Sequence, residues 1–127
     1  MTPPRLVTAL RACAAGFYPL EAGVGLLIEN GTFLHRSDFT SRFIHHGTSS
    51  GTHMAAVDWE AATTALAAGE LPCSGGERRI LALAASLADG APVALRDAVA
   101  GMDDRNVQLL VKAVLHASGR RQFPALS

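Results

Sequence analysis

Residues 74–90 read SGGERRILALAASLADG. Ser74 and Glu77 have the spacing of a capping box, in which each side chain accepts a hydrogen bond from a backbone N–H that the helix start leaves unpaired. The run behind this box is apolar nearly all round, with Ser86 as its one polar residue before the end. A helix without a polar face is one that other helices surround. This stretch therefore predicts the central helix of the fold, over about residues 75–88.

The composition predicts a helical fold around that helix. The chain has 127 residues, of which 49% are hydrophobic and 17% charged. This length fits one domain, and the hydrophobic share is enough to form a core. Alanine is the commonest hydrophobic residue, and it favours helices over sheets. We therefore expect an all-α fold, a compact bundle of about six helices forming a single domain over residues 1–127, with a polar tail from about residue 119.

The segment before residue 36 permits two local structures. Asn30-Gly31, between apolar residues, is a signal for a tight β-hairpin near residues 25–35. The same apolar residues also follow the i, i+4, i+7 spacing of a helix face, and Gly31 can end a helix in the left-handed conformation. They lack the strict alternation of a strand. We predict a helix over residues 20–30 and keep the small hairpin as the alternative.

The next segment is predicted to hold a short helix followed by a loop. Ser37 can cap a helix that His45 and His46 close before a glycine. The sequence GTSSGTH at residues 47–53 then consists almost entirely of turn-forming residues. We expect a flexible loop over those residues.

The last helix is predicted over residues 104–118, with Asp103 as its N-cap. Its apolar residues recur with helical spacing, so we expect them to face the core. They are Val107, Leu110, Val111, Val114 and Leu115. Arg105 and Lys112 are expected on the outer side.

Four of the five histidines lie between residues 35 and 53, which makes this region the first candidate for a metal site. Imidazole and carboxylate groups are ligands for zinc and iron. The candidate ligands are His35, Asp38, His46 and His53. Their spacing matches no metal-binding motif. We therefore expect neither a bound metal nor another cofactor.

A covalent enzyme would need a nucleophile beside a base. Cys73 directly precedes the central helix, and a helix N-terminus lowers the pKa of a thiol. His45 and His46 are the candidate bases. The chain contains no G-x-S-x-G nucleophile motif. The catalytic residues stay unknown beyond these three candidates, and an enzyme is the less favoured class.

The start of the central helix is also a candidate anion site. Gly75 and Gly76 leave backbone N–H groups accessible at the positive end of the helix dipole, and Arg78 and Arg79 add two guanidinium groups. The spacing is not that of a phosphate-binding P-loop. The alternative interpretation, without a bound anion, is that nearby acidic side chains neutralise the charges of the two arginines.

Residues 95–121 offer a possible nucleic-acid surface, because they contain a short helix, a turn and a longer helix. Asp103 and Asp104 would begin the recognition helix and repel phosphates. The 11 basic and 11 acidic residues of the chain also cancel, so it has no net field that attracts nucleic acid. Arg120 and Arg121 are the remaining basic pair. Binding to nucleic acid is therefore not favoured.

Three functions remain as hypotheses. The leading one is a small soluble helical module that acts through protein contacts, including self-association as a homodimer. The alternatives are a metal-dependent or His/Cys-using enzyme with its site within residues 35–58, and a nucleic-acid-binding regulator. The apolar stretch near the start is interrupted by Arg11, which is too early for a secretory signal, and no stretch is long enough to span a membrane. We expect a cytoplasmic protein with no membrane partner.

Overall fold

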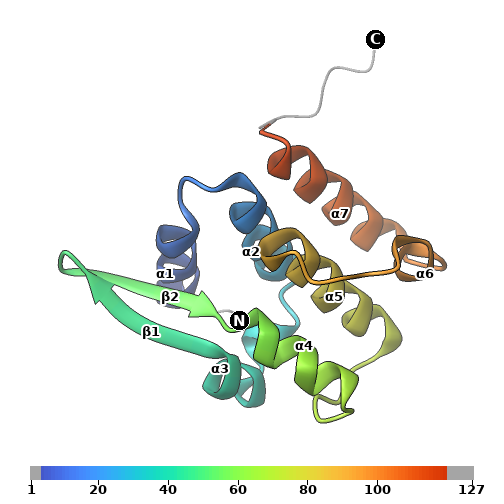
Figure 1. Ribbon diagram of the computed structural model, residues 1–127, viewed down its shortest axis with the longest axis horizontal. Helices are drawn as coiled ribbons and strands as arrows, with labels where there is room; N and C mark the ends of the chain where they lie inside the picture. The colour runs from blue at the N-terminus through green and yellow to red at the C-terminus, as the bar shows by residue number, and fades with distance from the viewer. Residues whose placement is uncertain (1–3, 120–127) are drawn as a thin grey trace.

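The computed structural model describes residues 4–119. These residues form seven α-helices, one short 3-10 helix and a two-stranded antiparallel sheet (Figure 1). In chain order they are α1 (Pro4–Ala14), α2 (Tyr18–Asn30), η1 (Phe33–His35), α3 (Ser37–Phe43), β1 (Ile44–Ser49), β2 (Thr52–Val57), α4 (Trp59–Ala67), α5 (Gly75–Asp89), α6 (Leu95–Val99) and α7 (Asp104–Ala117). The prediction of a mainly helical fold is confirmed. None of the helices in this part of the chain is both long enough and apolar enough to cross a lipid bilayer.

Helix α5 is the centre of the fold, as predicted. It packs against α2, α4, α6 and α7. The capping box is complete, because the Glu77 N–H donates to Ser74 Oγ at 3.2 Å and the Ser74 N–H donates to Glu77 Oε1 at 2.6 Å. The side chains that α5 buries are Ile80, Leu81, Leu83, Ala84 and Ala85.

The ambiguous segment before residue 36 is helical. Helix α2 ends at Asn30, and Gly31 follows it in the left-handed conformation with φ 81°. The Gly31 N–H donates to the Leu27 carbonyl at 3.1 Å, which satisfies one of the carbonyls that a helix end leaves unpaired. The helix prediction is therefore confirmed, and the alternative hairpin near residues 25–35 does not form.

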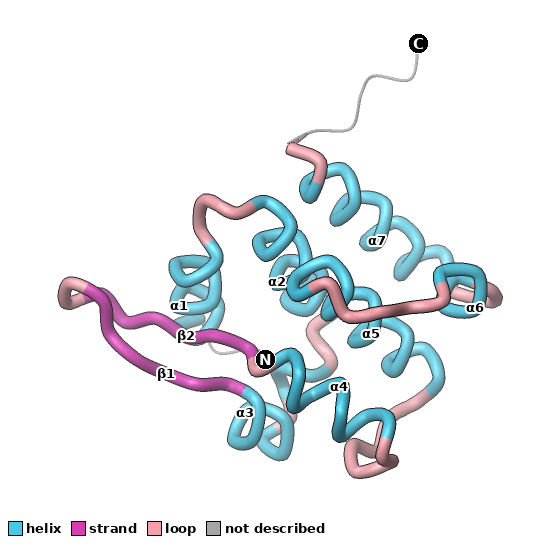
Figure 2. The backbone as a smooth tube through the Cα atoms, viewed as in Figure 1, coloured by secondary structure: helices cyan, strands magenta, loops and turns pink. Residues whose placement is uncertain are grey.

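A hairpin does form further along the chain, where the sequence led us to expect a helix end and a loop. Strands β1 and β2 pair from Ile44 opposite Val57 to Ser49 opposite Thr52. Ser50 and Gly51 make the two-residue connection, both with positive φ, 50° and 79°. Turns of this kind match the right-handed twist of paired strands. Figure 2 shows the tip of the hairpin extending away from the helices.

The prediction that His45 and His46 close a helix was wrong for two physical reasons. The Ser-Gly turn favours pairing of the residues on either side of it. The base of the hairpin is also anchored on one face, where Ile44, Ala55 and Val57 are buried. Burial of that face compensates for the weak strand propensity of the glycine and histidines in β1.

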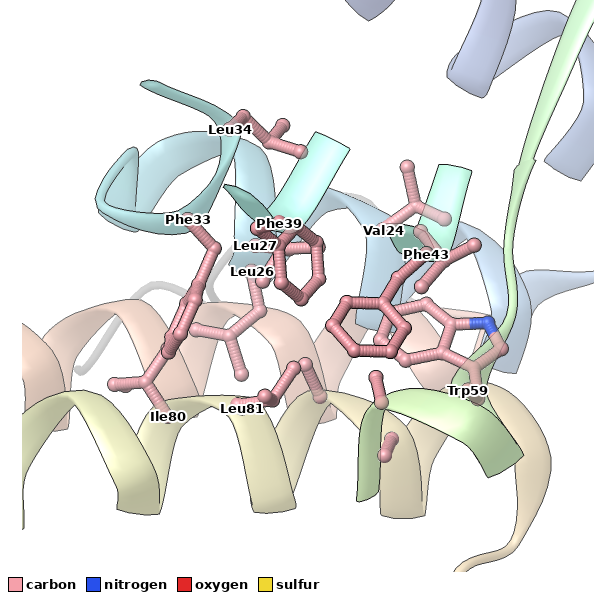
Figure 3. Packing of buried hydrophobic residues seen from close by; sticks show 14 of the residues in the cluster. Val24, Leu26, Leu27, Phe33, Leu34, Phe39, Phe43, Trp59, Ile80 and Leu81 are labelled. Carbon is pink, nitrogen blue, oxygen red and sulfur yellow. The ribbon is translucent and has the colours of Figure 1, made fainter. Parts of the chain in front are cut away.

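The core is built where phenylalanines from η1 and α3 meet α5. The rings of Phe33 and Phe39 lie 5.1 Å apart, and those of Phe39 and Phe43 lie 5.3 Å apart, centre to centre. Figure 3 shows these rings above Ile80 and Leu81 of α5. Because β1 begins directly after Phe43, this cluster also fixes the base of the hairpin.

The last helix, α7, is rotated relative to our expectation. It buries Asn106, Leu110 and Ala113, whereas three of its valines are exposed. These three, Val107, Val111 and Val114, recur at the i, i+4, i+7 spacing of one helix face, and we call them the valine face. The prediction that they face the core was wrong.

Polar contacts with α2 account for the rotation of α7. The Arg105 guanidinium donates to the Glu29 carbonyl, and the Lys112 ammonium is paired with the Glu29 carboxylate. On the same two helices, the Asn30 amide donates to Asn106 Oδ1 at 3.0 Å. These contacts turn the side of α7 that carries Asn106 toward α2, and they leave the valine face outside.

Candidate functional site

The hairpin distributes its histidines over two faces. Successive side chains of a strand point to opposite faces. His45 therefore lies on one face, and His46 lies on the other together with His53, which is diagonal to it in the register. The structure thus separates two neighbouring histidines and brings together two that are seven residues apart.

On the first face, His45 is held by Asp58. His45 Nε2 lies 3.1 Å from Asp58 Oδ2, while Asp58 Oδ1 accepts the Ala61 N–H at 3.0 Å and so caps α4. Two hydrogen bonds hold the pKa of Asp58 below its ordinary value of 3.8. The larger contribution comes from the Ala61 N–H and the smaller one from His45. The carboxylate is therefore ionised at neutral pH and orients the imidazole.

An open depression of about 400 Å³ lies next to this pair. Residues of α3 and α4, with the residues on either side of α4, line it: Arg42, Phe43, Asp58, Glu60, Ala61, Thr64, Ala65 and Glu70. Arg42 is paired with Glu70 across 3.4 Å. Thr64 supplies the one hydroxyl of this lining, which otherwise offers carboxylates and a guanidinium. The depression could hold a small polar ligand, but it presents no thiol or serine for the His45–Asp58 pair to activate.

On the second face, His46 and His53 are in direct contact. His46 Nδ1 lies 3.0 Å from His53 Nε2. The ring centres are 5.2 Å apart and the ring planes differ by 13°. Both residues are exposed, so this contact is a surface feature of the hairpin and no part of the core.

The four candidate metal ligands do not form one cluster. His46 and His53 meet, but Asp38 is paired with Arg36, whose guanidinium donates to both carboxylate oxygens. This bond holds the pKa of Asp38 below its ordinary value. His35 lies against Gly31 at the end of α2. Within residues 4–119, no group of three or more His, Cys, Asp or Glu side chains is placed to hold a metal ion.

The structure also separates the candidate catalytic residues. The rings of His45 and His46 contact Asp58 and His53, and Cys73 lies on the connection that leads into α5. Burial raises the pKa of the Cys73 thiol, and the charges of Arg78 and Arg36 only partly oppose this. Our expectation of a lowered thiol pKa at the helix start was wrong, because the cost of removing the thiolate from water outweighs the attraction of nearby positive charges.

Two polar groups of the candidate anion site at the start of α5 make other contacts. The capping box uses the Glu77 N–H, and Arg78 donates to the Leu66 carbonyl at 3.2 Å. The Arg79 guanidinium lies beside Gly101, in the connection to α7. The two arginines therefore extend to different parts of the chain, while Gly75 and Gly76 stay exposed.

The candidate nucleic-acid surface has a similar arrangement. Asp103 caps α7 by accepting the Asn106 N–H at 2.8 Å. The basic residues Arg105 and Lys112 are both engaged with Glu29. Arg120 and Arg121, the other basic pair of this hypothesis, lie outside the described residues.

Two features were missed in the sequence, although each had a local signal. The Ser50-Gly51 dipeptide, with threonines at positions 48 and 52 on either side, is a hairpin signal that the surrounding glycines and hydroxyl residues obscured. On α7, the apolar residues cover a wider arc than a single packed face needs, so part of the arc had to stay outside. The chain matches no protein-family model, no curated protein and no solved structure.

Proposed function

We propose that this chain is a small helical module that works through protein contacts, with the valine face of α7 as its contact surface and a second copy of the chain as the partner. The observation that carries the proposal is the location of the exposed large hydrophobic side chains of the described part. They are Phe17, Tyr18, Leu95, Val99, Val107, Val111 and Val114. All belong to α7, to α6 directly before it, or to the start of α2 and the residue before that helix.

The start of α2 lies beside the C-terminal end of α7. The Tyr18 ring meets the His116 ring edge to face, with centres 5.9 Å apart. Exposed apolar side chains thus occur at both ends of α7 as well as along it. Single exposed hydrophobic residues are ordinary, but a concentration of them along one element is typical of an interaction surface.

The basic residues of α7 lie away from its valine face, and Asp104 lies at the end of this face, three residues before Val107. Arg105 and Lys112 are turned toward Glu29 of α2, and the valines themselves are 38%, 42% and 50% exposed in chain order. The surface offered to a partner is therefore apolar and uncharged in its middle. Such a surface favours another apolar helix face over a nucleic acid or a charged peptide.

A second copy of the chain, related to the first by a twofold axis, can cover the valine face with its own valine face. In an antiparallel pair of α7 helices, Val111 lies near its own equivalent, and Val107 of each copy meets Val114 of the other. The N-terminal end of α7 is acidic, because Asp103 caps the helix and Asp104 is its first residue. Two arginines follow the helix in the sequence, and this order of charges along the chain favours the antiparallel orientation.

The test is the mass of the protein in solution as it is diluted. We expect the unaltered chain to have twice the monomer mass in light scattering at high concentration and to dissociate on dilution. Val111→Lys places an ammonium group in the centre of the contact and should give a monomer at every concentration. Gln108→Lys is the matched control, because it adds the same charge at an exposed position of α7 beside the valine face and should keep the dimer.

Two results would overturn this proposal. One is an unaltered chain that is monomeric throughout the series. The other is a Val111→Lys variant that stays dimeric with an unchanged circular dichroism spectrum.

The same observations bear on the expected location and on the two alternative functions. Both cysteines in the chain are free, which agrees with the reducing cytoplasm that we expect as the compartment. The enzyme hypothesis receives less support, because its candidate residues are apart. The nucleic-acid hypothesis is also weaker, because α7 has its own basic residues engaged by α2.

A further inference from the structure

The pairing of His46 and His53 is a product of the hairpin register. His46 is opposite Ala55 and His53 is opposite Thr48, so the two imidazoles come from diagonal positions on one face of the sheet. Side chains in diagonal positions are within reach of each other when they are long or aromatic. The hairpin therefore holds two ring nitrogens 3.0 Å apart at an exposed point of the molecule.

This pair differs from the contacts of His45 and His116 in what each ring faces. His45 is engaged by Asp58, and His116 lies 2.6 Å from a carboxylate oxygen of Glu21. Both of those rings face an anion. In the His46–His53 pair, each ring instead faces a second imidazole, and imidazole is a preferred ligand of zinc, copper, iron and nickel.

The separation of the two nitrogens fits some of these metals better than others. Bonds from a metal to imidazole nitrogen are about 2.0–2.1 Å long, so two nitrogens 3.0 Å apart subtend an angle of about 90° at the ion. Neighbouring positions of a tetragonal or square-planar ion have this angle, whereas tetrahedral zinc prefers a wider one. We propose that His46 Nδ1 and His53 Nε2 bind one Cu²⁺ or Ni²⁺ ion, with water in its other positions.

Binding at this site needs only local changes. Without metal, one of the two facing nitrogens carries a proton and donates it to the other. When the ion binds, that ring changes to its other tautomer, so both facing nitrogens offer a lone pair and no proton is lost from the pair. Because both side chains are exposed, the rings can rotate to aim at the ion without disturbing the core.

The experiment is titration of the full chain with Cu²⁺, followed by calorimetry and by electron paramagnetic resonance. We expect one ion per chain, with the spectrum of two nitrogen ligands. His46→Ala and His53→Ala each leave a single imidazole and should weaken binding about a hundredfold, because the second ligand then no longer acts at high effective concentration. His45→Ala is the matched control, since it removes a histidine from the opposite face of the same strand and should leave the affinity unchanged.

A further variant separates metal binding from a structural role of the pair. His46→Gln can keep a hydrogen bond to His53 but is a poor metal ligand, so it should retain the circular dichroism spectrum and lose the copper affinity. The proposal is overturned if His46→Gln or His53→Ala binds Cu²⁺ as tightly as the unaltered chain. A spectrum without two nitrogen ligands, or loss of the site in His45→Ala, would also overturn it.

Discussion

Gly23 of α2 lies directly against Ala84 and Ala88 of α5. A Cβ at position 23 would be 2.5 Å from the Ala84 carbonyl oxygen and 2.6 Å from the Ala88 Cβ. Real side chains do not approach a backbone oxygen so closely, so the two helices are packed at a distance that only glycine permits. This contact sets how closely α2 approaches the central helix.

Substitution of this glycine should separate the two helices. We expect Gly23→Ala to lower the free energy of unfolding by about 1–3 kcal/mol, because the added methyl group overpacks a contact with backbone. Gly25→Ala is the matched control on the same helix, where an added Cβ meets nothing within 4 Å. That variant should raise stability by about 0.5–1 kcal/mol, since alanine loses less conformational freedom than glycine in a helix. Urea unfolding of both variants measures this, and equal effects would contradict the close packing.

The amide contact between Asn30 and Asn106 should appear as an energetic coupling of α2 and α7. Asn106 is buried, and its Oδ1 accepts the Asn30 amide at 3.0 Å. Each single change to alanine should cost about 1–2 kcal/mol, because the remaining amide then lacks its partner. In a double-mutant cycle followed by chemical unfolding, the two costs should differ from additivity by about 1 kcal/mol. Strictly additive costs would mean that the amides do not interact in solution.

The charge of Asp58 should contribute to stability in a pH-dependent way. Its pKa is held below the ordinary value by the Ala61 N–H and by His45. A lowered pKa in the folded state gives stability that is present above the unfolded pKa and is lost as the pH falls through the folded pKa. Asn caps a helix about as well as Asp but does not titrate.

We therefore expect Asp58→Asn to be less stable than the unaltered chain near neutral pH, with the difference shrinking below about pH 4. Urea unfolding at several pH values provides the measurement. His45→Ala should reduce the same pH dependence only in part, because Ala61 is the larger cause of the lowered pKa. A difference between Asp58→Asn and the unaltered chain that grows as the pH falls would contradict the assigned sign.

The two cysteines should react at different rates. Cys13 is exposed, whereas Cys73 is half-buried and has a raised pKa. Because the thiolate is the reactive form, iodoacetamide at neutral pH should alkylate Cys13 faster than Cys73. Mass spectrometry of the labelled peptides over time measures both rates in one sample. In denaturant the rates should converge, and faster labelling of Cys73 in the folded protein would restore it as a candidate nucleophile.

Much of the fold was predictable because its signals are local. The capping box at Ser74 and Glu77 and the left-handed Gly31 each depend on a few neighbouring residues, and the structure contains both as expected. The apolar run between Arg79 and Asp89 has too little polar surface for any place but the centre. Such features can be predicted from the sequence, since helix capping and the burial of a helix that is apolar on all sides do not depend on which element packs against it.

The features that matter for the proposed sites were decided only by tertiary structure. Strand pairing needs two segments at once, and burial of Ile44 and Val57 at its base stabilises a hairpin that β1 alone does not favour. The hairpin register, in turn, brings His46 to His53. On α7, burial of Leu110 and Ala113 and the contacts of Arg105 and Lys112 with Glu29 together orient the helix, and they leave the valine face exposed. The periodicity of a sequence predicts how wide the apolar face of a helix is. The orientation of that helix depends on residues that are distant in the sequence.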